Sequence, residues 1–192
     1  MAYRFRSIAR PLIATAFVVT LAVGCASTEA GTRTEETRRT KASSKASGVG
    51  APLPPIVVKR LGNGKKLDLS SHRGKAVLLD IWASWCAPCK EELPLLDDLA
   101  ARLKPKGIEI IAVSIDEEEA NATAFLSARK HWTLTVAHDP EGKVPDLLKP
   151  GKMPTSYVLD GTGIVRYVNE GFERSDLEKL ERRLLAVAEG DS

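Results

Sequence analysis

Two cysteines that stand two residues apart, directly after an apolar run, constrain this chain more than any other feature. Residues 82–90 read Trp-Ala-Ser-Trp-Cys-Ala-Pro-Cys-Lys, and the run 77–82 is nearly all apolar, as in a central strand covered on both faces. A helix-forming run follows, so we expect Cys86 at a helix N-terminus, where unpaired N–H groups and the helix dipole stabilise a thiolate. Cys89 lies one turn further on, within reach of a mixed disulfide. The pattern therefore predicts thiol–disulfide chemistry.

A Cys-x-x-Cys pair can also bind a metal. A structural zinc site needs two more ligands, and the chain offers no second paired motif. The remaining candidates are Cys25, His72, His131 and His138. We expect the three histidines to lie in or near loops, exposed to solvent. A Cu(I) site built from two thiolates and a histidine stays open, because soft sulfur ligands suit that metal.

The first 24 residues have the layout of a targeting segment. Three arginines precede an apolar core at residues 12–23, which is too short for a comfortable membrane span. The segment ends Leu-Ala-Val-Gly-Cys, which resembles the lipobox of bacterial lipoproteins, although Ala22 stands where that pattern usually has leucine. We therefore expect a signal peptide at 1–24 and lipidation of Cys25. An ordinary secretory signal or an uncleaved anchor is the alternative.

Charge and composition set the rest of the organisation. The formal net charge of +3 equals the three arginines of residues 1–24, so the remaining chain is balanced and gives no reason to expect nucleic-acid binding. Residues 25–51 carry the lipid anchor site and a polar stretch that cannot bury enough apolar surface to order itself. We expect a disordered tether there, with a reach of about 25–30 Å. Residues 52–189 are long enough for one domain with its own core.

Hydrophobic periodicity and turn residues predict the elements of this domain. The pattern gives an α/β arrangement in which helices flank a mixed central sheet. We expect a hairpin at 57–68, a strand at 77–82, a helix at 88–103 kinked at Pro94, a strand at 108–115, a helix at 117–130, a strand at 133–137, a hairpin from 156–159 and 164–168, and a last helix opened by a capping box of Ser175 and Glu178.

These features resemble the thioredoxin fold. The likeness rests on the order of elements, the Trp-Cys-x-x-Cys sequence and the later segment Met153-Pro154-Thr155. The N-terminal β-hairpin and a β/α insert around residues 116–150 resemble the TlpA-like branch, the membrane-tethered thiol–disulfide oxidoreductases. The resemblance spans residues 52–189.

The resemblance implies roles for the residues of the cysteine motif. Cys86 would be the attacking thiolate and Cys89 the resolving thiol, so that their redox-active disulfide is the only cofactor and no metal is needed. Ala87 and Pro88 would shape the turn between them, since proline suits the first turn of a helix.

The same resemblance implies a client-binding surface. Pro154 would be the family's cis-proline, opposite the cysteines, with Met153 and Thr155 on either side. A client segment would pair with the backbone of Met153 as an added strand. We expect Trp85 to contact the client from the surface and Trp82 to pack inside.

Asp80 stands in an otherwise apolar strand, six residues before Cys86. Thioredoxins keep a buried acid there, and a desolvated carboxyl has a raised pKa that suits proton exchange with Cys89. The lysine that accompanies it in thioredoxin is missing, because the next strand reads Ile-Ala-Val-Ser at 111–114. The alternative is a strand-end aspartate bonded to backbone.

Four functions are compatible with these residues. The first is a lipid-anchored protein-disulfide reductase of the bacterial cell envelope, facing the periplasm or exterior. It would take electrons from a membrane thiol donor and pass them to oxidised client proteins, such as those of cytochrome c maturation or copper delivery. A dithiol oxidase and a Cu(I)-binding module are the alternatives. A peroxidase is disfavoured, because residues 108–165 resemble the alkyl hydroperoxide reductase branch, yet its threonine three residues before the cysteine is Ala83 here.

Overall fold

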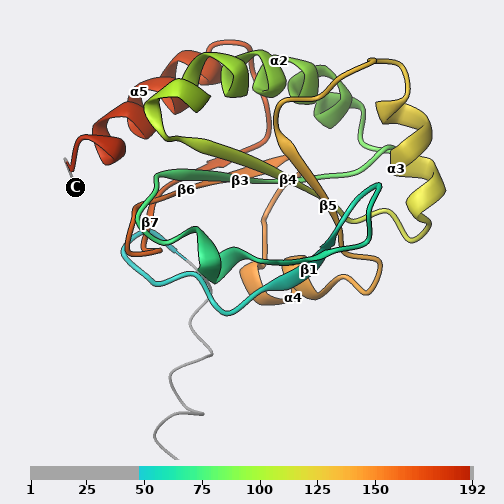
Figure 1. Cartoon of the computed structure of the whole chain (residues 1–192), viewed down its shortest axis with the longest axis horizontal. Helices are drawn as coiled ribbons and strands as arrows, with labels where there is room; N and C mark the ends of the chain where they lie inside the picture. The colour runs from blue at the N-terminus through green and yellow to red at the C-terminus, as the bar shows by residue number, and fades with distance from the viewer. Residues whose placement is uncertain (1–47, 191–192) are drawn as a thin grey trace, which may run out of the picture.

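A seven-stranded mixed sheet forms the centre of the molecule, in the order β2-β1-β5-β4-β3-β6-β7 (Figure 1). The computed structural model describes residues 48–190. Neighbours β3, β4 and β5 are parallel, whereas the β1, β6 and β7 pairings are antiparallel. The strands are β1 (Val57–Arg60), β2 (Lys66–Asp68), β3 (Val77–Trp82), β4 (Glu109–Ser114), β5 (Thr135–His138), β6 (Thr155–Leu159) and β7 (Val165–Glu170).

Helices cover both faces of the sheet. They are α2 (Ala87–Leu103), α3 (Glu119–Leu126), α4 (Lys143–Leu148) and α5 (Asp176–Ala188). In Figure 1, α2 and α5 lie over one face and α4 lies on the opposite side. The thioredoxin-like α/β fold expected from the sequence is thus confirmed, with helices flanking a mixed sheet and an N-terminal hairpin.

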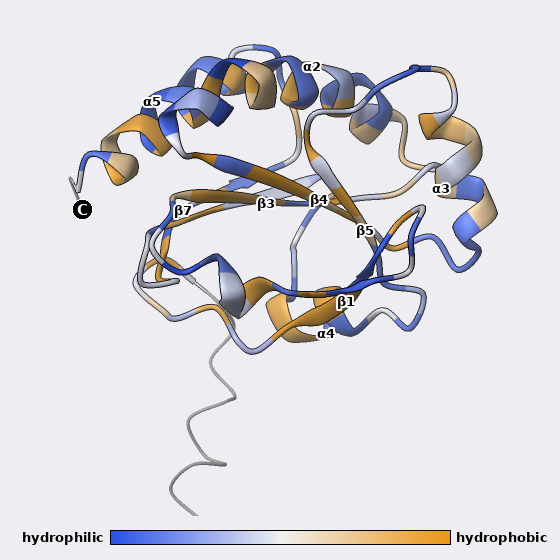
Figure 2. Ribbon diagram, in the orientation of Figure 1, coloured by the Kyte–Doolittle hydropathy of each residue, from blue (hydrophilic) through white to orange (hydrophobic). Residues whose placement is uncertain are grey.

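Strand β3 separates two hydrophobic cores. Its side chains alternate between faces: Leu78 and Trp82 belong to the core beneath α2 and α5, while Val77, Leu79 and Ile81 belong to the core on the α4 side. Figure 2 shows apolar residues concentrated along the central strands. Since Asp80 shares the parity of Leu78 and Trp82, its carboxyl is directed into the core that also contains both cysteines.

The predicted strands and the long helix are confirmed, whereas two local predictions are wrong and one helix was not predicted. Helix α3 ends at Leu126, because residues 127–130 form turns rather than another helical turn. Helix α4, inside the insert, was not anticipated. The capping box of Ser175 and Glu178 does not form: Ser175 makes no side-chain cap bond, and Asp176 instead accepts a 2.8 Å hydrogen bond from the N–H of Glu173.

The described residues before position 52 already contact the sheet. Gly50 donates a 2.8 Å backbone hydrogen bond to Val165, and Val165 donates one of 2.9 Å to Ala51, so this segment lies along the start of β7. The signal peptide, Cys25 and most of the expected tether lie outside the described residues. Within residues 48–190, no helix has the length and apolarity needed to cross a membrane.

Candidate active site

The two cysteines occupy the turn from β3 into α2 and form a disulfide, with an S–S distance of 1.98 Å and Cα atoms 5.3 Å apart. Cys86 is the N-cap of α2, as predicted, and its Sγ accepts a 3.3 Å hydrogen bond from the N–H of Cys89. Ala87 and Pro88 follow as the first helical residues. A thiolate at Cys86 would therefore face the N–H groups of the first helical turn.

Exposure to solvent differs between the two cysteines and between the two tryptophans. Cys86 is 6% exposed and Cys89 only 1%, so Cys86 is the more accessible residue of the pair. Trp85 is 65% exposed beside it, whereas Trp82 is fully buried and packs 5.5 Å from Phe125, centroid to centroid. The placements expected for both tryptophans are confirmed.

The Met153–Pro154 peptide bond is cis, as expected. Strand β6 begins at Thr155, which stands opposite Ile81 of β3, so Pro154 lies next to the end of the strand that leads into the cysteine turn. Gly171 donates a 2.7 Å hydrogen bond to the carbonyl of Pro154. This bond ties the loop that carries Met153 to the residue that follows β7.

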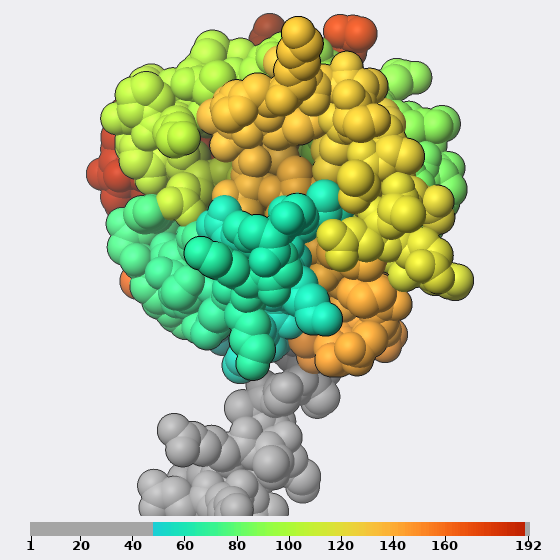
Figure 3. Space-filling model, turned by 45° about the vertical axis from the view of Figure 1, so that its right-hand side comes forward, coloured from blue at the N-terminus to red at the C-terminus, as the bar shows by residue number. Residues whose placement is uncertain are grey.

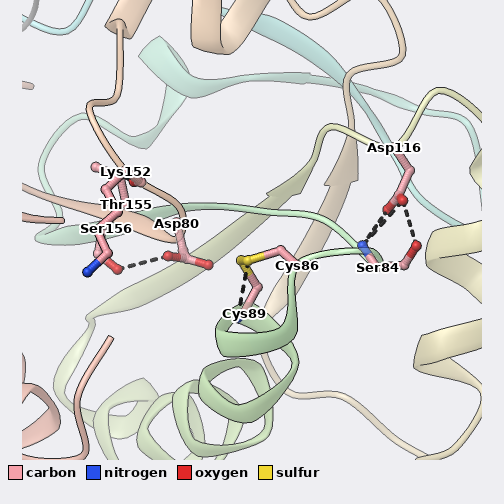
Figure 4. Close-up of a disulfide and its surroundings, with 8 residues drawn as sticks. All are labelled: Asp80, Ser84, Cys86, Cys89, Asp116, Lys152, Thr155 and Ser156. Carbon is pink, nitrogen blue, oxygen red and sulfur yellow. Dashed lines mark hydrogen bonds between the residues drawn. A yellow bond between two sulfur atoms is a disulfide. The ribbon is translucent and has the colours of Figure 1, made fainter. Parts of the chain in front are cut away.

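Asp80 points toward the disulfide from the middle of β3 (Figure 4). Its side chain is 1% exposed and accepts a 2.8 Å hydrogen bond from the hydroxyl of Ser156. Burial raises the pKa of Asp80 to about 7, and the Ser156 bond only partly offsets that effect. Across β4 its neighbour is Ala112, so no cation comes from that strand. The hydrogen-bond partner of the Asp80 carboxyl is therefore the hydroxyl of Ser156 and not a backbone group.

Glu92 is a second buried acid, which was not singled out from the sequence. It lies on α2 one turn after Cys89, is fully buried, and neither carboxyl oxygen has a hydrogen-bond partner among the described residues. Burial, together with the negative charges of Asp80 and Asp176, raises the pKa of Glu92 to about 10. The raised pKa favours the protonated, neutral form of Glu92. Its neighbour Glu91 is exposed, and a helical period of 3.6 from Cys89 would have distinguished the two.

Asp116 is the third buried acid near the site, and it was also missed. It follows β4, is 1% exposed, and binds Ser84 in the cysteine turn (Figure 4). His138, which we expected to be solvated, is instead buried in β5 and contacts the carbonyl of Asp116 at 2.7 Å. That prediction failed because the strand extends one residue beyond the expected end and carries the imidazole inside.

A separate hollow lies away from the cysteines. It opens between the β1–β2 hairpin and the end of α2, over β5 (Figure 3), and encloses about 410 Å³. Its lining includes Arg60, Lys104 and Thr135, at the opposite ends of the parallel strands from the cysteines. Within residues 48–190, no group of three or more His, Cys, Asp or Glu side chains is arranged to hold a metal ion.

Similarity to known proteins extends over most of the described residues. The model of the AhpC/TSA family matches residues 49–168. The thiol-disulfide oxidoreductase ResA of Oceanobacillus iheyensis is 37% identical over 151 residues, which is 77% of this chain and 77% of ResA.

Two solved structures share the fold. The crystal structure of a putative thiol:disulfide interchange protein DsbE from Chlorobium tepidum has a TM-score of 0.70 and 35% identity, and the match covers 74% of this chain and 99% of that one. The exposed lipoprotein thioredoxin Etrx1 of Streptococcus pneumoniae has a TM-score of 0.59 and 26% identity, covering 68% of this chain and all of that one.

Proposed function

This chain belongs to the AhpC/TSA family, and from that membership we propose that it is a thiol–disulfide oxidoreductase that reduces disulfides of extracytoplasmic proteins. One observation carries the proposal: the Cys86–Cys89 disulfide caps α2 with Cys86 outermost, beside the cis-proline loop. Two similar proteins support it: ResA is named a thiol-disulfide oxidoreductase, and DsbE is named a thiol:disulfide interchange protein.

The reaction is a two-electron exchange that needs only the cysteine pair. In the reduced protein, the Cys86 thiolate attacks one sulfur of a client disulfide, and the other client sulfur leaves as a thiolate that takes up a proton. The Cys89 thiolate then attacks Cys86 Sγ and releases the second client thiol. The protein is left with the Cys86–Cys89 disulfide seen in the structure, and a thiol donor must reduce it again.

Asp80 supports this exchange as the proton acceptor for Cys89. Cys89 is buried and must lose its proton before it attacks. A carboxyl whose pKa lies near 7 takes up and returns a proton at neutral pH with little bias in either direction. Figure 4 shows its carboxyl directed at the disulfide.

The client binds across the surface that Trp85 and the cis-proline loop share. Trp85 offers an exposed aromatic face next to Cys86, of the kind that anchors protein partners. An extended client segment pairs with the backbone of Met153, and this places its disulfide over Cys86. Thr155 stabilises the loop because its hydroxyl donates to the carbonyl of Lys152.

Location and partners form a further part of the proposal. The lipobox-like sequence before Cys25 supports a lipid-anchored protein of the bacterial cell envelope, as does the likeness to a structure titled as an exposed lipoprotein thioredoxin. In that setting a membrane thiol donor supplies the electrons. Clients of cytochrome c maturation or copper delivery would receive them, with the disulfide as the only redox group.

The alternatives differ in a measurable way. A dithiol oxidase would use the same residues in the reverse direction, with a higher reduction potential. A Cu(I)-binding module would hold copper on both thiolates without turnover. A peroxidase is not supported, because Ala83 offers no hydroxyl three residues before Cys86.

The reduction potential of the Cys86–Cys89 pair tests the proposal directly. The full chain is equilibrated in thiol redox buffers while the fluorescence of its tryptophans is followed. A potential near about −270 mV, as in thioredoxin, is expected for a reductase. A value near about −120 mV would reverse the direction, and the absence of a two-electron transition would leave copper binding as the better function.

A further inference from the structure

Asp116 binds the turn that precedes the nucleophilic cysteine. Both of its carboxyl oxygens accept from the N–H of Ser84, at 3.2 and 3.0 Å, and Oδ1 also accepts from the Ser84 hydroxyl at 2.6 Å. Oδ2 accepts a further 2.7 Å bond from the hydroxyl of Ser114. The Asp116 carboxyl, just after β4, thus holds Ser84 in the turn that follows β3.

Asp116 is itself fixed from two strands. Its N–H donates a 3.1 Å hydrogen bond to Ser114 Oγ in β4, and Nε2 of His138 in β5 lies 2.7 Å from its carbonyl oxygen. All three residues are at most 5% exposed. The carboxyl that binds Ser84 is therefore held in place by the sheet, as a residue that positions a functional group requires.

Among the described residues, hydrogen bonds, without an ion pair, offset the cost of burying the Asp116 carboxyl. Burying a carboxylate costs several kcal/mol unless its lone pairs are satisfied. Within the described part of the chain, no lysine, arginine or histidine side chain forms an ion pair with it, and its donors are the groups of Ser84 and Ser114. Displacing Ser84 would leave a buried oxygen unsatisfied, so the turn has one strongly preferred arrangement.

We infer that Asp116 is a positioning residue: through Ser84 it fixes the place of Trp85 and Cys86 relative to the cis-proline loop. The inference rests on the proposed function. The next residue after Ser84 is the exposed Trp85, and the N–H of Cys86 closes the turn on the carbonyl of Ala83 at 3.1 Å. When the disulfide opens, the Cys86 side chain loses its covalent bond to Cys89, and the Asp116–Ser84 contact keeps the Cys86 sulfur aligned for attack.

The test is the rate at which the reduced full chain reacts with oxidised glutathione, which needs no client. In Asp116→Asn an amide nitrogen that cannot accept replaces one carboxyl oxygen, and in Ser84→Ala the hydroxyl donor is lost. Each is expected to lower the second-order rate constant about tenfold, because small misplacements of reacting groups are costly. Ser84→Thr keeps the hydroxyl and is expected to restore the rate. The double variant is expected to be no slower than Asp116→Asn, since both changes break one contact.

Asp139→Asn is the matched control. Asp139 is also a buried acid that follows a strand, and it accepts a 2.6 Å hydrogen bond from the N–H of Val144, away from the cysteine turn. It is expected to lose stability while its exchange rate stays within about twofold of wild type. Exchange rates for Ser84→Ala and Asp116→Asn that stay within about twofold of wild type, as expected for Asp139→Asn, would overturn the inference.

The inference stays testable if a variant or the activity itself fails. If Asp116→Asn does not fold, the pair Ser84→Ala and Ser84→Thr suffices: equal rates overturn the inference, and a slow alanine variant beside a fast threonine variant supports it. If the wild-type chain exchanges no disulfide, the proposed function fails and this inference fails with it. A fast wild type with unaffected variants refutes only the positioning role.

Discussion

Ser156 and Asp80 stand directly opposite each other in the antiparallel β3–β6 pair, and the Ser156 hydroxyl donates a 2.8 Å hydrogen bond to Asp80 Oδ1. Both side chains are 1% exposed. The serine reaches one oxygen of the carboxyl, while Figure 4 shows the group directed at the disulfide. The β3–β6 pairing thus places Asp80 next to the first residues of β6. These residues directly follow the cis-proline, Pro154.

Asp80→Asn is expected to remove a step from the pH profile of disulfide exchange. Because the pKa of Asp80 is raised to about 7, the wild-type rate should change slope near pH 7 in addition to the titration of Cys86. The variant should show only the cysteine titration. Stopped-flow rates from pH 5 to 9 check this, with exposed Asp98→Asn on α2 as the control. An unchanged profile in Asp80→Asn would exclude the proton-acceptor role.

Glu92→Gln is expected to change how stability depends on pH. The pKa of Glu92 is raised from 4.5 to about 10, so between these values the folded protein binds a proton that the unfolded chain has lost. The free energy of unfolding therefore falls as pH rises through this window, and glutamine removes that loss. The melting temperature of Glu92→Gln should exceed that of wild type by about 5 °C or more at pH 8, and the difference should shrink toward pH 4.5.

Glu91→Gln provides the comparison for that experiment, because Glu91 is exposed on the same helical turn. Its melting temperature should follow wild type across the whole pH range. A Glu92→Gln variant that also follows wild type would show that the buried carboxyl carries no such penalty.

Trp85→Ala and Trp82→Ala are expected to separate client binding from folding. Trp85 is 65% exposed, so its removal should change the free energy of unfolding by less than about 0.5 kcal/mol. It should lower kcat/KM for a protein disulfide such as insulin and leave the rate with oxidised glutathione unchanged. Trp82 is fully buried, and its removal should cost about 3–5 kcal/mol. Equal losses with both substrates in Trp85→Ala would contradict a client-contact role.

Single cysteine variants are expected to trap different species. Cys89→Ser should accumulate a mixed disulfide between Cys86 and a client, since the resolving thiol is missing. Cys86→Ser should form none, because Cys89 is 1% exposed. Non-reducing electrophoresis and mass spectrometry distinguish the two. A stable adduct on Cys89 in the Cys86→Ser variant would reverse the assigned roles.

Sequence alone determined the features that depend on local chemistry and periodicity. The cysteine turn at the start of α2, the buried strand β3 and the cis-proline position follow from a short motif, an apolar run and a family resemblance. Each of these features can be predicted from a few neighbouring residues in the sequence. The expected acid Asp80 was found for the same reason, as a single charge inside an apolar strand.

Only the tertiary structure decided how residues distant in sequence meet. Asp116 reaches Ser84 because β3 and β4 are parallel neighbours, and the ends of parallel strands meet at one edge of the sheet. The pKa of Glu92 depends on packing, because α2 buries its carboxyl near the charges of Asp80 and Asp176, which come from other elements. His138 is buried because it is the last residue of β5. The sequence supplies each group, but burial and hydrogen-bond partners are set by the pairing of strands and helices, and these fix the pKa and the role.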